Sequence, residues 1–171
     1  MILLECKGEE MNDFMNIYTV SFFGHRELYD LRSIDKQLEP ILHALIKRKS
    51  YISFLIGRNG AFDEYVAPVI KRIQKEVGKD NNDMTLVLPY AVADLEYYKR
   101  YYDYIFIPDS VEGVHPKSAI TLRNRWMVEQ SDLVIFNVMH KNGGAFAAMK
   151  YAKALNKKII NLGESEQCNF I

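Results

Sequence analysis

The stretch ISFLIGRNGAFDEYVAPVIKRIQKEVG, from Ile52 to Gly78, contains a strand, a glycine turn and a helix in immediate succession. Its first six residues are mostly apolar without alternation, which is typical of a strand buried on both faces of a parallel sheet. After the turn, apolar residues recur at helical spacing and a glycine follows as a cap: Phe62, Val66, Val69, Ile73, Val77 and Gly78. The stretch therefore predicts one βα unit of a parallel sheet.

The same alternation extends over the rest of the chain. Five further β-rich runs are Ile17 to Gly24, Met84 to Pro89, Tyr104 to Pro108, Leu133 to Val138 and Lys158 to Gly163. Helical patterns lie at Ile34 to Leu45, Asp94 to Tyr102, after Pro116 and from Gly144 to Leu155; the first is expected to be regular only from Glu39, because Pro40 interrupts it. This order predicts an α/β fold: a doubly wound, mainly parallel sheet of about six strands with helices on both faces. We expect a single domain over residues 16–171, preceded by a polar lead-in of residues 1–15.

The charge of the chain is balanced. Its 171 residues include 22 Lys and Arg and 22 Asp and Glu, so the formal net charge is +0. A neutral total gives no global argument for a nucleic-acid partner, and we expect none, although a local basic patch is compatible with it. No run approaches the ~18 apolar residues of a membrane span, and acids replace the cations of a signal peptide, so we expect a cytoplasmic protein with no membrane partner. Cys6 and Cys168 lie far apart without paired ligands, which disfavours a disulfide framework and a metal site.

Ligands of open α/β sheets bind at the carboxyl ends of the strands, so the loops there are the candidate site. Glycines in these loops let backbone N–H groups approach a phosphate at a helix N-terminus. Three loops have this character: Gly24-His25-Arg26, Gly57 to Asp63 with Gly60, and Asn142-Gly143-Gly144. The glycine turns at Gly57 to Gly60 and at Gly143-Gly144 match neither a dinucleotide fingerprint nor a P-loop. The prediction of phosphate binding therefore depends on the loops lying together at one edge of the sheet.

Several side chains near these loops allow two interpretations. Arg26 would clamp a phosphate or pair with a neighbouring carboxylate of Glu27 or Asp30. Arg123 and Arg125 would assist if their helix faces the cleft, and otherwise form a solvated face on which Arg125 pairs with Glu129. Asp63 would cap the helix or bond a ribose hydroxyl.

A run of tyrosines between Tyr97 and Tyr104 also has two interpretations. Exposed aromatic rings can stack on bases, but tyrosines at this spacing more often pack against a neighbouring element or a second subunit. We expect packing, and we expect the protein to form a homo-oligomer. No arrangement typical of nucleophilic or metal catalysis is present in the sequence.

Five segments, in the right order from about Ile17 to Leu162, resemble the YpsA-like proteins of the SLOG superfamily, which are Rossmann-like domains related to the LOG and DprA/Smf proteins. They are SFFGHR at Ser21 to Arg26, FLIGRNGAFDEYVA at Phe54 to Ala67, HPK at His115 to Lys117 with LRNRWMV at Leu122 to Val128, SDLVI at Ser131 to Ile135, and GGAFA from Gly143 with YAK from Tyr151. The resemblance implies a Rossmann-like, nucleotide-binding domain.

The chain departs from these families at the last glycine loop. Ala145 replaces the usual threonine of the YpsA-like pattern. Against the LOG phosphoribohydrolase motif, Asn142 replaces a proline and Lys150 replaces the catalytic glutamate. The resemblance therefore implies the scaffold and does not carry LOG catalysis.

We accordingly expect a protein that binds or senses a nucleotide or its derivative, such as an ADP-ribose-like compound or a nucleotide sugar, without catalysis and without a resident cofactor. The expected ligand-binding residues are Gly24, His25, Arg26, Gly57, Gly60, Asp63, Arg123, Arg125, Asn142, Gly143 and Gly144. One alternative is an enzyme that cleaves N-glycosidic bonds, of the LOG or nucleoside deoxyribosyltransferase type, with Asp63 or Glu64 as its carboxylate. The other is a DprA-like module that binds single-stranded DNA, against which the neutral charge argues.

Overall fold

The computed structural model describes residues 16–164 of the chain. The expected lead-in and both cysteines lie outside the described residues. The strands are β1 (Ile17–Gly24), β2 (Tyr51–Ile56), β3 (Asn82–Val87), β4 (Tyr104–Phe106), β5 (Leu133–Asn137) and β6 (Lys158–Asn161). They form one sheet in the order β4-β3-β2-β1-β5-β6, and every pair of neighbours is parallel. The predicted α/β fold with a doubly wound, six-stranded parallel sheet is confirmed.

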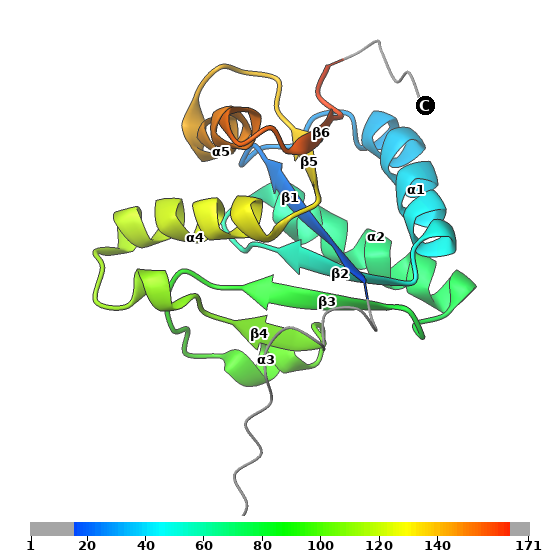
Figure 1. Ribbon diagram of the computed structural model, residues 1–171, viewed down its shortest axis with the longest axis horizontal. Coiled ribbons are helices and arrows are strands. Elements are labelled where there is room, and N and C mark those ends of the chain that lie inside the picture. The colour runs from blue at the N-terminus through cyan, green and yellow to red at the C-terminus, as the bar shows by residue number, and fades with distance from the viewer. Residues whose placement is uncertain (1–15, 165–171) are drawn as a thin grey trace, which may run out of the picture.

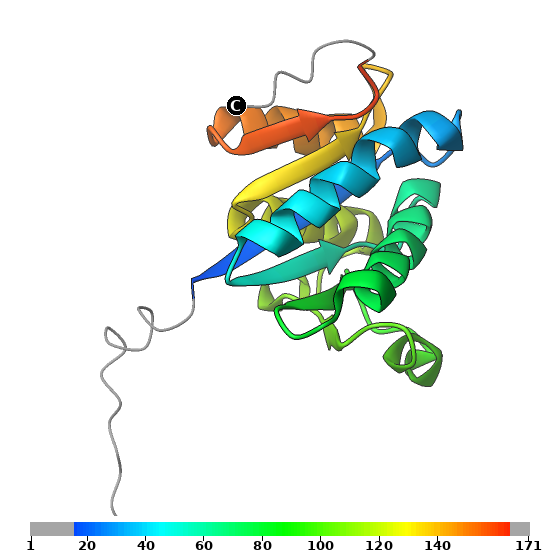
Figure 2. The same cartoon turned by 90° about the vertical axis from the view of Figure 1, so that its right-hand side faces the viewer.

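Helices cover both faces of this sheet (Figures 1 and 2). They are α1 (Leu31–Arg48), α2 (Ala61–Val77), the short α3 (Leu95–Lys99), the 3-10 turn η1 (Asp109–Val111), α4 (Pro116–Gln130) and α5 (Gly143–Ala154). Val20 and Phe22 of β1 face the cluster formed with α1 and α2, whereas Phe23 faces the cluster formed with α4 and α5. None of the helices within residues 16–164 is long and apolar enough to cross a membrane.

Helix α1 begins eight residues earlier than the sequence predicts. It runs from Leu31 through Pro40 without interruption, and the side chain of Asp30 caps it by accepting from the Ser33 N–H. Pro40 and Lys36 are both exposed, so the Lys36 carbonyl that Pro40 cannot satisfy faces solvent. Burial of an apolar stripe on the opposite side outweighs the lost hydrogen bond: Ile34, Leu38, Ile41, Leu42 and Ile46.

The strand order reverses beside β1, which pairs with β2 on one side and with β5 on the other. The chain leaves β1 and β2 toward α1 and α2, and leaves β5 toward α5 on the other face. The loops that follow β1 and β5 therefore diverge at this point. Such a switch point opens a crevice at the carboxyl edge of the sheet.

Candidate functional site

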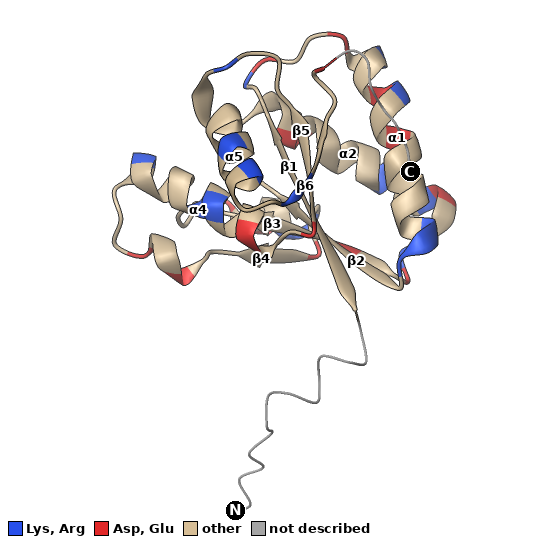
Figure 3. Ribbon diagram, turned by 45° about the horizontal axis from the view of Figure 1, so that its top comes forward, with Lys and Arg blue, Asp and Glu red and all other residues tan. Residues whose placement is uncertain are grey.

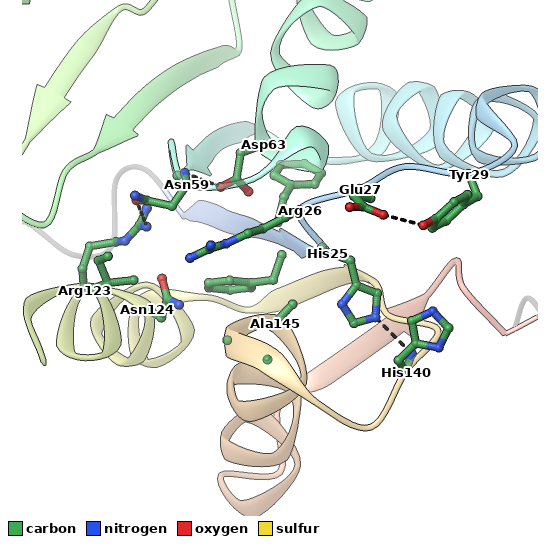
Figure 4. Close-up of a pocket in the computed structure, with 17 residues that line it drawn as sticks. His25, Arg26, Glu27, Tyr29, Asn59, Asp63, Arg123, Asn124, His140 and Ala145 are labelled. Carbon is green, nitrogen blue, oxygen red and sulfur yellow. Dashed lines mark hydrogen bonds between the residues drawn. The ribbon is translucent and has the colours of Figure 1, made fainter. Parts of the chain in front are cut away.

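A cavity of about 370 Å³ lies at this switch point, beside the carboxyl ends of β1 and β2 and the first turn of α5 (Figure 4). Most of the predicted site residues line it: Gly24, His25, Arg26, Gly57, Asp63, Arg123, Gly143 and Gly144. The remaining three, Gly60, Arg125 and Asn142, do not. The structure thus brings together three loops that are far apart in the sequence.

The three residues outside the cavity have other surroundings. Gly60 is the N-cap of α2, and a side chain there would meet the carbonyl oxygens of Gly24 and His25 at 3.6 Å. The Arg125 guanidinium lies 5.3 Å from the centre of the Tyr151 ring, and no ion pair joins it to Glu129 within the described residues. Asn142 is the N-cap of α5.

The first turn of α5 borders the cavity, and its two glycines leave the backbone there uncovered by side chains. Gly143 has φ 81°, a left-handed conformation that favours glycine. A Cβ on Gly144 would project into free space, with the Asn124 amide nitrogen as its nearest neighbour at 3.9 Å. The N–H groups of a first turn have no intrahelical acceptor and carry the positive end of the helix dipole, so this turn can receive an anion.

Arg26 is exposed in the loop after β1, and its side chain extends into the cavity (Figure 4). Both neighbouring carboxylates have other partners: Glu27 accepts from the Tyr29 hydroxyl at 2.5 Å, and Asp30 caps α1. No ion pair joins Arg26 to either of them in the described part of the chain. The guanidinium is therefore free to bind an oxyanion with two parallel hydrogen bonds.

His25 connects the loop after β1 with the loop after β5. Its Nε2 accepts hydrogen bonds from the N–H groups of Met139 and His140, each at 3.0 Å, so this nitrogen is unprotonated. Burial, together with the neighbouring His140 ring, lowers the pKa of His25 below its ordinary value. The residue thus positions the two loops and need not touch a ligand itself.

Two buried side chains of opposite charge, Arg123 and Asp63, lie at the floor of the cavity and are connected through Asn59. Arg123 is only 2% exposed and donates to the Val87 carbonyl at 3.0 Å and to the Asn59 side-chain oxygen at 2.8 Å. Asp63 accepts from the Asn59 N–H at 3.1 Å. Gly57 is required here, because a Cβ would approach Arg123 Nη1 to 2.3 Å.

Burial dominates the electrostatics of this pair. It raises the pKa of the Asp63 carboxyl to about 6, although Arg123 and the Asn59 N–H act in the opposite direction. Burial also lowers the pKa of Arg123, against the attraction of Asp63, and its Nε has no hydrogen-bond partner in the described structure. Asp63 therefore holds the loop before α2 through the Asn59 N–H, and no side chain among the described residues caps the start of that helix.

Nine residues that line the cavity were not among the expected ligand-binding residues: Phe22, Phe23, Glu27, Tyr29, Asn59, Ile120, Asn124, His140 and Ala145. Helical spacing offered a signal for α4, because residues 120, 123 and 124 share one face whereas residue 125 points elsewhere. The same face carries the exposed Lys117 one turn earlier.

Charge is interspersed over the surface, with basic and acidic positions on most elements (Figure 3). The three loops and α4 carry four exposed cations, of which Arg26 lines the cavity and Arg58, Lys117 and Lys141 do not. Its lining carboxylates are Glu27 and Asp63, of which the second is buried. Among residues 16–164, no group of three His, Cys, Asp or Glu side chains could hold a metal ion. The arrangement is suited to binding a phosphate.

Comparisons with known proteins bear on the fold. No family model matches the sequence, and no curated protein matches it. The X-ray structure of DNA processing protein A (DprA) from Streptococcus pneumoniae aligns with a TM-score of 0.61 and 15% identity, over 85% of this chain and 50% of that chain. DNA processing protein A from Helicobacter pylori, in a structure described for its single-stranded DNA binding mode, aligns with a TM-score of 0.58 and 14% identity, over 89% of this chain and 67% of that chain.

The likeness shows that this chain has the Rossmann-like fold of the DprA structures, and that it spans half the length of the S. pneumoniae protein. The narrower YpsA-like resemblance is not confirmed. Two expectations are wrong: that the ligand is a small nucleotide to be sensed, and that nucleic acid is not a partner. Both similar structures are DNA-processing proteins, and one is described as binding single-stranded DNA. A net charge of zero is no argument against nucleic-acid binding, because binding depends on charges near a site and not on their sum over the molecule.

Proposed function

We propose that this chain binds single-stranded DNA, with a backbone phosphate in the cavity at the switch point. The observation that carries the proposal is the convergence of Arg26 and the open first turn of α5 on one cavity of about 370 Å³. This volume accommodates one nucleotide unit, and the cavity opens to the surface between the loops, so a strand can enter and leave. The backbone of single-stranded DNA presents the same phosphate groups as a free nucleotide, for which the glycine loops are suited.

The fold adds independent support. DprA structures share the architecture, and the H. pylori protein is described as binding single-stranded DNA. The five resembling segments place the chain near the same superfamily, and the narrower YpsA-like assignment rests on those segments alone. Self-association and a cytoplasmic location stay predictions.

The proposal is tested by titrating the full chain into a fluorescently labelled thymidine oligonucleotide of about 20 nucleotides and following the anisotropy. Arg26→Ala should weaken binding by about 1.5–3 kcal/mol, the range for a hydrogen bond to a charged group. Arg26→Lys should restore part of the loss, because lysine supplies charge without the planar fork.

Arg48→Ala is the matched control. Arg48 is an exposed arginine in the last turn of α1, at the opposite edge of the sheet from the cavity. Its removal changes the net charge as Arg26→Ala does and should leave the affinity nearly unchanged. Equal losses in both variants would show a non-specific charge effect and contradict binding in the cavity.

A further inference from the structure

A second cavity of about 380 Å³ adjoins the first and is lined by tyrosines of the α3 region. We call it the tyrosine groove and define it by Arg58, Tyr97, Tyr98, Tyr101 and Tyr102. Gly57 lines both cavities, so the groove continues from the phosphate site along the loop after β2. Nothing in the proposed phosphate site makes use of this surface.

The groove exposes aromatic rings to solvent. Tyr97 is 56% exposed and Tyr101 is 42% exposed, and neither belongs to the two apolar clusters of the core. The ring of Tyr98 meets that of Tyr97 edge-on at 5.3 Å between centres, which fixes the orientation of both. Tyr97 and Tyr101 therefore present stacking surfaces outside the packed core.

The charged residues of the groove indicate where the phosphates and the bases of a bound DNA strand would lie. The Arg58 guanidinium lies 5.4 Å from the centre of the Tyr98 ring, at the end nearest the first cavity. The Glu64 carboxylate lines the same groove and would repel a phosphate. Single-stranded DNA therefore fits the groove with its phosphate backbone near Arg58 and its bases against the tyrosines.

We propose that the tyrosine groove is a second subsite for single-stranded DNA, in which bases next to the bound phosphate stack on Tyr97 and Tyr101. The proposal rests on the proposed function, which it extends from the phosphate to the neighbouring bases. Stacking on aromatic side chains tolerates any base, because every base has a π-face. The subsite thus predicts affinity for bases without sequence preference.

The test compares two oligonucleotides of about 20 positions that carry the same number of phosphates, a thymidine strand and a fully abasic strand. Wild-type protein should prefer the thymidine strand by about fivefold or more, because only that strand can stack. The double variant Tyr97→Leu/Tyr101→Leu keeps apolar bulk without a flat ring, and should lose this preference while binding the abasic strand as before. Tyr97→Phe/Tyr101→Phe keeps both rings and should retain the preference.

Tyr104→Ala is the matched control, because Tyr104 is 61% exposed and lies outside both cavities. It should leave the preference intact. If the double leucine variant does not fold, as judged by circular dichroism, Tyr97→Ala at the more exposed position carries the same test alone.

Each outcome is decisive. An unchanged preference in the leucine variant would overturn the second subsite and leave the proposed function standing. Failure of the wild-type chain to bind either strand would overturn both. If the leucine substitutions instead convert a dimer into a monomer in sedimentation velocity and the preference persists, the groove is an interface between copies of this chain.

Discussion

Asp63 and Arg123 are both buried at the floor of the cavity, where each bonds to Asn59, and burial is the largest influence on the pKa of each. The raised pKa of Asp63, about 6, has a definite consequence for stability. The folded state holds the proton more tightly than the unfolded state, whose pKa is the ordinary 3.8. The free energy of unfolding should therefore fall as the pH rises from about 4 to 6, and stay level above that window.

Asp63→Asn should remove this pH dependence, because asparagine resembles the protonated carboxyl and does not titrate. The difference in unfolding free energy, variant minus wild type, should increase between pH 4 and pH 7 by on the order of 3 kcal/mol, from a shift of about two pKa units. Denaturant titrations at several pH values measure it. A difference that decreases over this range would show that attraction to Arg123 outweighs burial.

Gly144 and Gly143 have separate roles, which the sequence could not separate. Gly143 needs its positive φ, whereas Gly144 leaves space for the ligand. Gly144→Val should fold normally, because its Cβ meets no atom closer than 3.9 Å, and should weaken DNA binding by at least about 1.4 kcal/mol, or tenfold. Isothermal calorimetry measures this loss.

Ala147→Val is the control for Gly144→Val. It introduces the same β-branched side chain into the same helix at an exposed position outside the cavity. DNA affinity should be unchanged in this variant. A Gly144→Val protein that binds as tightly as wild type would exclude the first turn of α5 from the site.

At the scale of the elements, the loops after β1 and β5 act together through His25. His25→Ala should speed amide hydrogen exchange at Met139 and His140, which lose their acceptor, and weaken DNA binding by about 1 kcal/mol. His43→Ala, on α1 away from the cavity, should change neither. Unaltered exchange in His25→Ala would show that the loops hold their positions independently.

The pH dependence of this contact follows from the lowered pKa of His25. The folded state disfavours the proton, so the contact stabilises the loops above the ordinary pKa of 6.5. It is lost as the pH falls through the lower, folded-state pKa. Exchange at Met139 and His140 in wild-type protein should then approach that of the variant.

The elements themselves were largely predictable. Continuous apolar runs located all six strands. Burial on both faces explains the runs of the inner strands β2, β3 and β5, whereas the edge strands β4 and β6 are apolar although partly exposed. Pro40 misled the start of α1, since tertiary packing of the stripe from Ile34 to Ile46 overrides one missing hydrogen bond. For α4, the sequence analysis proposed both Arg123 and Arg125 as ligand-binding residues. The two lie on different faces of the helix: Arg123 is buried at the floor of the cavity, whereas Arg125 lies over the Tyr151 ring.

At the scale of the whole molecule, the fold determines which loops meet, and the local charges determine what they can bind. The sequence located the three glycine loops, but not the reversal of strand order that places them at one cavity. The zero net charge describes the whole surface and carries no information about the charges near the cavity. Asn124 reaches the cavity from a neighbouring helix, so its place in the site follows only once the face of α4 that borders the cavity is known.

Amide hydrogen exchange of the full chain, with and without saturating thymidine oligonucleotide, tests most directly whether DNA binds at the switch point. The amides of Gly143, Gly144 and Ala145 lie in the first turn of α5 and lack intrahelical acceptors, so they should exchange rapidly in the free protein. The account predicts that DNA slows exchange there and in the loops at residues 24–26 and 57–60. Protection confined to other surfaces, or none at saturation, would contradict it.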